Sequence, residues 1–380
     1  MSMRWSGWPR VRLRIPDLSE RAGEDQGGPL SREARSAREV EAVAPLIISA
    51  SRSTDIPAFY GDWFMERLRA GYAKWVNPWN GIPVYVSFQD ARVFVFWSKN
   101  PAPFLPRLGE MARMGYGYYL LFTLNDYEAE GVEPRLPSLK ERIETFRSLS
   151  RMAGKGRIVW RWDPLLLSGS LDVSGLLDRI RRLGDALAPF TERMIFSFVD
   201  IAKYPRVARN LRKNGFGDIR EFSPEEELEL AAGLQELNRS WGLRISACGE
   251  ERDLSRFGIE KGHCIDRELM LAEFGDDAVL SRFLASPCPQ GTLFEGADLP
   301  EPSHLKDPGQ RAACGCVVSK DIGDYSTCPH LCAYCYANSA PARAMRRYNA
   351  CRSQAEKGNF GDSISGERGT PPGQQPGIGE

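Results

Sequence analysis

Residues 118–164 decide the fold class. They begin with the run YYLLFTLND at 118–126 and end with GRIVWRWDP at 156–164. Each run is almost continuously apolar before it reaches polar residues, which is typical of a strand covered on both faces of a parallel sheet. Between the runs, SLKERIETFRSLSRMAG at 138–154 has the apolar spacing of an amphipathic helix. A strand, a helix and a second strand in this order predict a right-handed βαβ unit.

The same alternation extends along most of the chain. Amphipathic helices are expected at 57–71, 172–187 and 223–242, and the run IPVYVSF at 82–88 is expected to form a hairpin with the next strand. We therefore predict an α/β protein with a full or partial TIM-like (β/α) barrel of mainly parallel strands. A doubly wound open sheet is the alternative. The further predicted strands are APLIISASRSTD at 44–55, VFVFWSKNP at 93–101, RMIFSFVD at 193–200, GLRISACGE at 242–250 and CGCVVSKDIGDY at 314–325.

The two ends of the chain lack this alternation. Residues 1–42 are rich in Arg, Gly, Glu and Ser, and residues 351–380 are rich in Gly and Pro. Such segments bury too little apolar surface to fold. We expect a disordered basic extension at 1–42, a barrel core at 43–350 and a disordered tail at 351–380.

Composition narrows the class of protein. Lys and Arg number 50, as do Asp and Glu, so the charge balance indicates neither nucleic acid nor membrane as a partner. No apolar run reaches the roughly eighteen residues of a spanning helix, and the basic N-terminus lacks the apolar segment of a secretory signal. Nine cysteines, an odd number clustered late in the chain, favour reduced thiols that bind metal. The predicted location is the cytoplasm.

Three of the cysteines lie in one short loop. In CPHLCAYC, Cys328, Cys332 and Cys335 are spaced C-x3-C-x2-C. Thiolates are soft ligands that bind zinc or iron–sulfur clusters, but the x3 spacing does not match the paired C-x2-C of zinc sites. Three ligands in one loop can hold three irons of a 4Fe–4S cluster, which leaves the fourth iron open. His330, inside the loop, is expected to orient it or to face solvent.

The C-x3-C-x2-C loop, with Tyr334 before its last cysteine, resembles the signature of the radical S-adenosylmethionine (radical SAM) superfamily. That resemblance implies that the open iron binds S-adenosylmethionine, whose reductive cleavage yields a radical that abstracts hydrogen from a substrate. It also implies an electron donor such as a flavodoxin or ferredoxin. In the superfamily this loop follows the first barrel strand, whereas here it follows the last predicted strand. The chain therefore resembles a circularly permuted radical SAM barrel.

A longer resemblance covers about Pro45 to Ser339. It rests on SASRSTDIPAFYGDWFMERL, FWSKNP, RWDP, FSFVD and CGCVVSKDIGDYSTCPHLCAYCYAN. Together these stretches resemble an uncharacterised bacterial family, the domain of unknown function 1848, which is similar to radical SAM proteins in its C-terminal cysteine cluster. The resemblance implies an iron–sulfur loop at 314–338 and a cofactor, but no particular reaction.

Chemistry in parallel α/β folds gathers where the strands end. That rule nominates Asp55, Asp163, Asp200 and Asp321, among others, each with helix capping or structural pairing as the alternative. The candidates for binding S-adenosylmethionine are Ser51, Arg52, Lys99, Asn125 and Arg161 at strand ends, with Tyr336 and Asn338 after the cysteines.

Four more cysteines are candidates for a second, closed 4Fe–4S cluster: Cys248, Cys264, Cys314 and Cys316. Alternatively, Cys248 and Cys264 are buried apolar residues. The expected function is that of a radical SAM-type oxidoreductase, lyase or transferase with an unknown polar substrate. The alternatives are a non-enzymatic iron–sulfur protein for electron transfer or sensing, and a zinc-stabilised binding protein.

Overall fold

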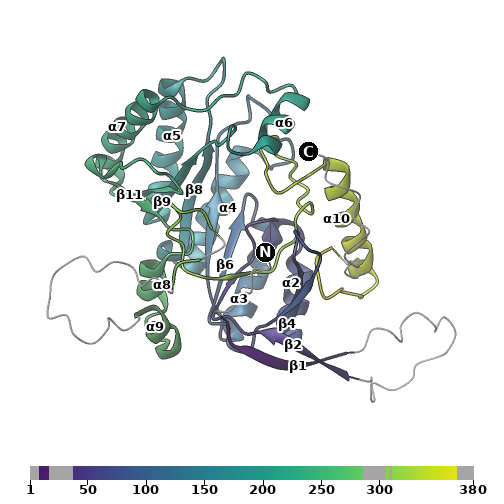
Figure 1. The fold of residues 1–380 in the computed structure, drawn as a ribbon. Helices are drawn as coiled ribbons and strands as arrows, with labels where there is room; N and C mark the ends of the chain where they lie inside the picture. Colours follow the sequence, from purple (N-terminus) through teal and green to yellow (C-terminus); the bar gives the residue numbers. More distant parts are fainter. Residues whose placement is uncertain (1–7, 17–36, 286–304, 308–309, 366–380) are drawn as a thin grey trace.

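The computed structural model of the chain describes residues 8–16, 37–285, 305–307 and 310–365 (Figure 1). Its main sheet has eight strands, all parallel, in the order β11-β10-β9-β8-β7-β6-β3-β12. The strands are β3 (Ile47–Ser49), β6 (Val93–Ser98), β7 (Gly117–Thr123), β8 (Ile158–Leu165), β9 (Arg193–Phe198), β10 (Arg244–Cys248), β11 (Ile259–Gly262) and β12 (Lys320–Asp321).

Both faces of this sheet are buried in its centre, because alternate residues of the central strands join two different apolar cores. In β6, for example, Phe94 and Phe96 belong to one core, whereas Val93 and Val95 belong to the other. The first core is covered by α1 (Ile56–Phe59), α2 (Gly61–Ala70), α3 (Leu105–Arg113), α4 (Leu139–Ala153), α5 (Val173–Leu187) and α7 (Pro224–Trp241). The second is covered by α8 (Arg267–Phe274) and α9 (Ala278–Ala285).

Two further helices lie near the cysteine loop, α6 (Pro205–Lys213) and α10 (Pro341–Glu356). α6 also packs on the first core through Val207 and Leu211. Short 3₁₀ helices complete the described elements: η2 (Ala102–Phe104), η3 (Lys155–Arg157), η4 (Ala188–Phe190) and η5 (Ser255–Phe257).

Several helix ends match the sequence signals. Ser223 and Glu226 form a capping box at the start of α7, and Ser138 with Glu141 forms another at α4. The helix expected at 57–71 is divided into α1 and α2 and ends at Gly71, whose φ of 79° favours glycine.

The sheet confirms an α/β fold of mainly parallel strands, but the expectation of a full barrel is wrong. β11 and β12 are the two edges, and the described residues contain no pairing between these strands. The strands follow chain order from β3 to β11, so the sheet also lacks the two outward-running halves of a doubly wound fold. The segments next to the two edges nevertheless meet. The backbone N–H of Val317 donates to the carbonyl oxygen of Ile265 at 3.0 Å.

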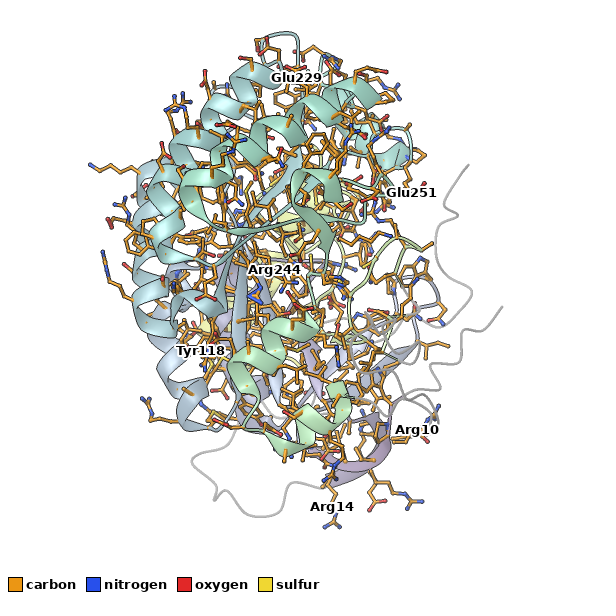
Figure 2. All side chains as sticks on the ribbon, turned by 90° about the vertical axis from the view of Figure 1, so that its left-hand side faces the viewer. Arg10, Arg14, Tyr118, Glu229, Arg244 and Glu251 are labelled. Carbon is orange, nitrogen blue, oxygen red and sulfur yellow. The ribbon has the colours of Figure 1, made fainter. Side chains whose placement is uncertain are left out.

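A second sheet corrects two other expectations. Its order is β1-β2-β5-β4, from β1 (Arg10–Pro16), β2 (Ala37–Val43), β4 (Tyr72–Val76) and β5 (Pro83–Ser87). β1 and β2 lie in the segment expected to be disordered, because alternating apolar residues in RVRLRIP pair across the two strands despite the many arginines. Figure 2 shows Arg10 and Arg14 at the periphery of the molecule. β5 pairs with β2 and β4, not with β6 as the predicted hairpin required.

The C-terminal boundary also differs, because α10 continues to Glu356, beyond the expected end of the core at 350. The remainder of the two predicted tails, at 1–7, 17–36 and 366–380, lies outside the described residues. Within the described parts of the chain, no helix is long and apolar enough to cross a membrane.

Candidate functional site

The cysteine loop lies over the carboxyl ends of the central strands. It follows β12 directly, and two hydrogen bonds tie it to the core: Tyr60 donates its hydroxyl to the carbonyl of Thr327 at 2.6 Å, and the N–H of Ala333 donates to Val132 at 2.9 Å. The sheet therefore places this loop where parallel α/β proteins carry their sites.

The three thiols of Cys328, Cys332 and Cys335 are close enough to influence one another electrostatically. Burial is the largest cause that raises the pKa of each thiol. Backbone N–H groups oppose this rise. Those of His330 and Asp55 are directed at the sulfur of Cys328, and those of Asn338 and Ala337 at the sulfur of Cys335. Such donors stabilise a thiolate over a thiol.

Asp55 and His330 hold the first half of the loop. One carboxylate oxygen of Asp55 caps α1 by accepting from the N–H of Ala58 at 2.9 Å. The other lies 2.8 Å from Nε2 of His330 and accepts from the N–H of Lys99 at 2.8 Å. The imidazole also packs edge-on against Phe59. These contacts agree with an orienting role for His330.

Lys99 and Asn125 hold the second half of the loop. The Lys99 ammonium lies 2.7 Å from Glu133, 2.9 Å from the Tyr334 hydroxyl and 3.4 Å from the carbonyl of Asp163. An ammonium has three donors, so all are used. The Asn125 amide nitrogen lies within 3.3 Å of the same three groups, and Tyr334 also donates to Glu133. Both residues lie at the predicted site, but their polar groups position Tyr334.

Ser51 and Arg52, just after β3, contact β12 and the segments on either side of it. The N–H of Arg52 donates to Asp321 at 2.7 Å, and its guanidinium donates to Asp307 at 3.0 Å. Gly323 approaches Ser51 so closely that a Cβ there would stand 1.9 Å from the Ser51 hydroxyl oxygen. The predicted residue Tyr336 joins this group, because its hydroxyl donates to the carbonyl of Arg52 at 2.9 Å.

Three of the predicted cofactor-binding residues have a polar atom that is available to bind a ligand. Arg161 pairs with Asp163 and reaches Thr123, while Asn338 donates its amide to the carbonyl of Cys328 at 2.8 Å. Nε of Arg161, Nη2 of Arg52 and Oδ1 of Asn338 are buried without a hydrogen-bond partner among the described residues. Buried polar atoms are normally paired, so unpaired atoms beside this loop fit a bound polar ligand.

The other four predicted metal ligands also converge. The sulfurs of Cys248 and Cys264 are 3.5 Å apart, and Cys264, Cys314 and Cys316 are buried in the second core. This group, which we call the four-cysteine group, lies beside the gap between β11 and β12. Within the described ranges, no set of three or more His, Cys, Asp or Glu side chains is arranged to hold a metal ion.

Sequence reasoning missed several residues. Glu133 and Tyr334 were not predicted as site residues, because no pattern in the sequence of a loop indicates that they contact Lys99. Glu250 follows Cys248 by two residues, so the strand-end rule was a usable signal. Burial raises the pKa of Glu250 to about 7, despite an N–H donated by Phe198 at 3.0 Å. A carboxyl group in that range can exchange protons near neutral pH.

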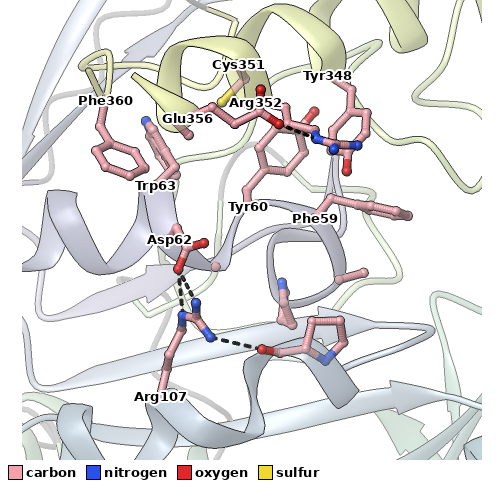
Figure 3. A pocket seen from close by; sticks show the side chains of 15 residues that line it. Phe59, Tyr60, Asp62, Trp63, Arg107, Tyr348, Cys351, Arg352, Glu356 and Phe360 are labelled. Carbon is pink, nitrogen blue, oxygen red and sulfur yellow. Dashed lines mark hydrogen bonds and ion pairs between the residues drawn. The ribbon is translucent and has the colours of Figure 1, made fainter. Parts of the chain in front are cut away.

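A pocket of about 410 Å³ lies on the other side of the loop, between the start of α2 and α10 (Figure 3). Its lining includes Trp63, Tyr348, Cys351 and Phe360. Phe59 and Tyr60 also line it, and they contact His330 and Thr327 of the loop. The pocket therefore borders the back of the cysteine loop.

The fold and this site define an α/β protein with a cysteine-bearing loop over an open parallel sheet. The chain belongs to the family described as Domain of unknown function (DUF1848), whose model matches residues 47–337. No curated protein and no solved structure matches the chain. The family description includes no activity, so function must be argued from the site.

Proposed function

We propose that this protein is an iron–sulfur enzyme of the radical SAM type, with a 4Fe–4S cluster on Cys328, Cys332 and Cys335. The observation that carries the proposal is the convergence of three thiols over the carboxyl end of the sheet, with backbone N–H groups directed at two of the sulfurs. Hydrogen bonds to the sulfurs are a feature that tunes such clusters.

The donor set fits this group. Each cysteine of a cluster binds a different iron, so the thiols need not surround one point as ligands of a single ion do. The imidazole of His330 faces Asp55, and the carboxylate of Glu133 faces Lys99, which leaves the thiols as the available ligands. The unpaired atoms of Arg52, Arg161 and Asn338 support a second, polar ligand beside the cluster.

When bound, a cluster with an open iron supplies the electron that cleaves S-adenosylmethionine and starts radical chemistry. The protein has to bind and orient this cofactor. Arg161 and Arg52 are the groups we assign to its carboxylate, because each has one buried guanidinium nitrogen without a partner among the described residues. Ser51, Tyr336 and Asn338 are assigned to the adenosine. Lys99 and Asn125, first expected to bind the cofactor, are assigned to holding the loop.

The strand order supports a permuted, partial radical SAM barrel as the finer description of the fold. β12 pairs with β3. If the chain were cut before Cys314 and its ends exchanged, β12 would become the first strand and the order would be sequential across the sheet. The cysteine loop would then follow the first strand, as in the superfamily.

The proposed substrate is polar, because charged side chains such as Asp163, Asp200 and Glu250 end the strands around the loop. The proposed electron donor is a flavodoxin or ferredoxin, and the proposed location is the cytoplasm, where thiols stay reduced.

The test is anaerobic purification, followed by electron paramagnetic resonance of the reduced protein with and without S-adenosylmethionine. We expect a cluster signal that shifts when the cofactor is added. The shift should disappear in the variant Cys328→Ala/Cys332→Ala/Cys335→Ala and persist in the control Cys351→Ala, since Cys351 lines the pocket behind the loop.

A cluster signal that ignores the cofactor would replace this proposal with an electron-transfer or sensor protein. Zinc on these three cysteines, without iron, would overturn the radical mechanism and favour the zinc-stabilised binding protein.

A further inference from the structure

The four-cysteine group brings together chain segments that are far apart in sequence. Cys248 ends β10, and Cys264 lies two residues beyond the end of β11. Their sulfurs are 3.5 Å apart. The N–H of Ile265 donates to the sulfur of Cys316 at 3.4 Å, which brings the segment before β12 to the same place. Cys314 lies beside Cys316 and faces its thiol.

The backbone around these thiols permits a close approach. A Cβ on Gly315, between Cys314 and Cys316, would stand 2.1 Å from the ring of His263. A Cβ on Gly262 would stand 2.8 Å from the backbone of Ala247. Nδ1 of His263 lies 2.6 Å from the carbonyl oxygen of Gly315. Glycines at these positions allow the two segments to press together and bring the thiols into contact.

Cations surround the group. Arg161 acts electrostatically on Cys248 and Cys264, Arg311 on Cys248, and Arg52 on Cys316. Each guanidinium is held by one carboxylate: Asp163 for Arg161, Asp200 for Arg311 and Asp307 for Arg52. Fixed cations next to sulfur stabilise thiolates, and thiolates are the form that binds metal.

If these were ordinary core cysteines, the approach of four thiols from three separate chain segments would be unexplained. A disulfide between Cys248 and Cys264 would leave the other two thiols without a role.

We propose that Cys248, Cys264, Cys314 and Cys316 together hold a second, closed metal centre that fastens the open side of the sheet between β11 and β12. All four ligands are thiolates, but among the described residues no three of them are arranged around one point as the ligands of a single ion are. A 4Fe–4S cluster, as the sequence predicts, fits this group, because each of its cysteines binds a different iron. The centre carries no free coordination position. This inference does not rest on the proposed function of the cysteine loop.

The test uses the full chain with the variant Cys328→Ala/Cys332→Ala/Cys335→Ala, which lacks the first set of thiols. Metal and sulfide are measured after anaerobic purification. We expect about four irons and four sulfides per chain, whereas about one zinc without sulfide would contradict the cluster. Changing the four-cysteine group to serine as well should remove that metal, whereas Cys351→Ser should not. A triple variant without metal would overturn the proposal.

Thiol accessibility can be measured in the unmutated chain, so this second test does not depend on whether a variant folds. Alkylation followed by mass spectrometry should leave Cys248, Cys264, Cys314 and Cys316 unmodified in the protein as purified. After oxidative chelation and re-reduction, all four should become reactive. Cys351 serves as the control because its reactivity should not change. Equal protection before and after chelation, or a disulfide between Cys248 and Cys264 in the purified protein, would contradict the inference.

Discussion

Lys99 shows how one buried side chain holds the cysteine loop. Its ion pair with Glu133 is largely shielded from water, with the two side chains 16% and 4% exposed. Glu133→Gln should destabilise the protein by about 3–5 kcal/mol, because it leaves a buried ammonium without its counter-charge. Urea unfolding of Lys99→Met, Glu133→Gln and the double variant measures the coupling, and the double variant should cost less than the sum of the singles.

The exposed ion pair Arg352–Glu356 is the matched control for this comparison of single and double variants. Its loss should change the free energy of unfolding by no more than about 0.5 kcal/mol, because solvent screens the pair. Additive effects of the two substitutions at Lys99 and Glu133 would show that the buried pair does not act as a unit.

The buried carboxyl group of Glu250 is expected to make the free energy of unfolding depend on pH. Its pKa of about 7 in the folded chain lies above its ordinary value of 4.5, mainly because of burial. The folded state therefore binds this proton more tightly than the unfolded state, and stability falls as the pH rises from about 4.5 through about 7. Glu250→Gln should remove that fall and raise the free energy of unfolding at pH 8 by about 1–3 kcal/mol.

Unfolding of Glu250→Gln and of the neighbouring exposed variant Glu251→Gln, measured from pH 5 to pH 8, checks this. The Glu251 variant should follow the parent chain across the range. If the two variants behave alike, the carboxyl group of Glu250 is ionised at little cost and the argument from burial fails.

At the scale of elements, α5 and α7 pack through glycine. A Cβ on Gly184 of α5 would stand 2.1 Å from the indole of Trp241 on α7, whose Nε1 donates to Asp185 at 2.9 Å. Gly184→Ala should therefore destabilise the protein by about 1–3 kcal/mol, because the rigid ring has to move. Gly109→Ala, in an open position of α3, should instead stabilise it by about 0.5–1 kcal/mol. Thermal unfolding that shifts both variants in the same direction would contradict this packing.

The elements also show what the sequence could predict. Apolar runs and helical periodicity located seven of the eight strands of the main sheet and helices α4, α5 and α7, because these patterns act over a few residues. They missed β11, which has only four residues. The partners of β5 and the gap between β11 and β12 depend on contacts between distant segments, which periodicity does not record. The β1–β2 pair was missed because the arginine-rich composition outweighed the alternation in RVRLRIP.

The residues of the candidate site also fall into two groups: those that local patterns predict, and those whose role depends on contacts between distant segments. Ser51, Arg52 and Arg161 could be predicted because parallel strands bring their ends to one edge of the sheet. The role of Lys99 could not, because it depends on Glu133, which is 34 residues away in a loop without a pattern. Local rules therefore placed residues at the site, whereas tertiary pairing determined what their polar atoms do.

At the scale of the whole molecule, a chain without net charge carries a basic helix beside the cysteine loop. α6 contacts the loop directly, since Asn210 donates its amide to the carbonyl of Cys335 at 3.2 Å. Arg209, Arg212 and Lys213 of this helix are exposed, and no ion pair joins them to a carboxylate in the described part of the chain. An acidic electron donor would be attracted to this surface.

Arg209→Ala/Arg212→Ala/Lys213→Ala should therefore slow reduction of the proposed loop cluster by an acidic flavodoxin several-fold at low salt, and should flatten its dependence on ionic strength. Stopped-flow reduction measures both effects. The charge-matched control is Arg113→Ala/Arg151→Ala/Arg239→Ala, in the last turns of α3, α4 and α7. These turns lie toward the amino end of the sheet, because each helix runs opposite to the strands. Reduction by dithionite should be the same in all three proteins, because a small donor needs no docking surface. Equal slowing by the two triple variants would mean that net charge, and not the position of α6 beside the loop, governs the encounter.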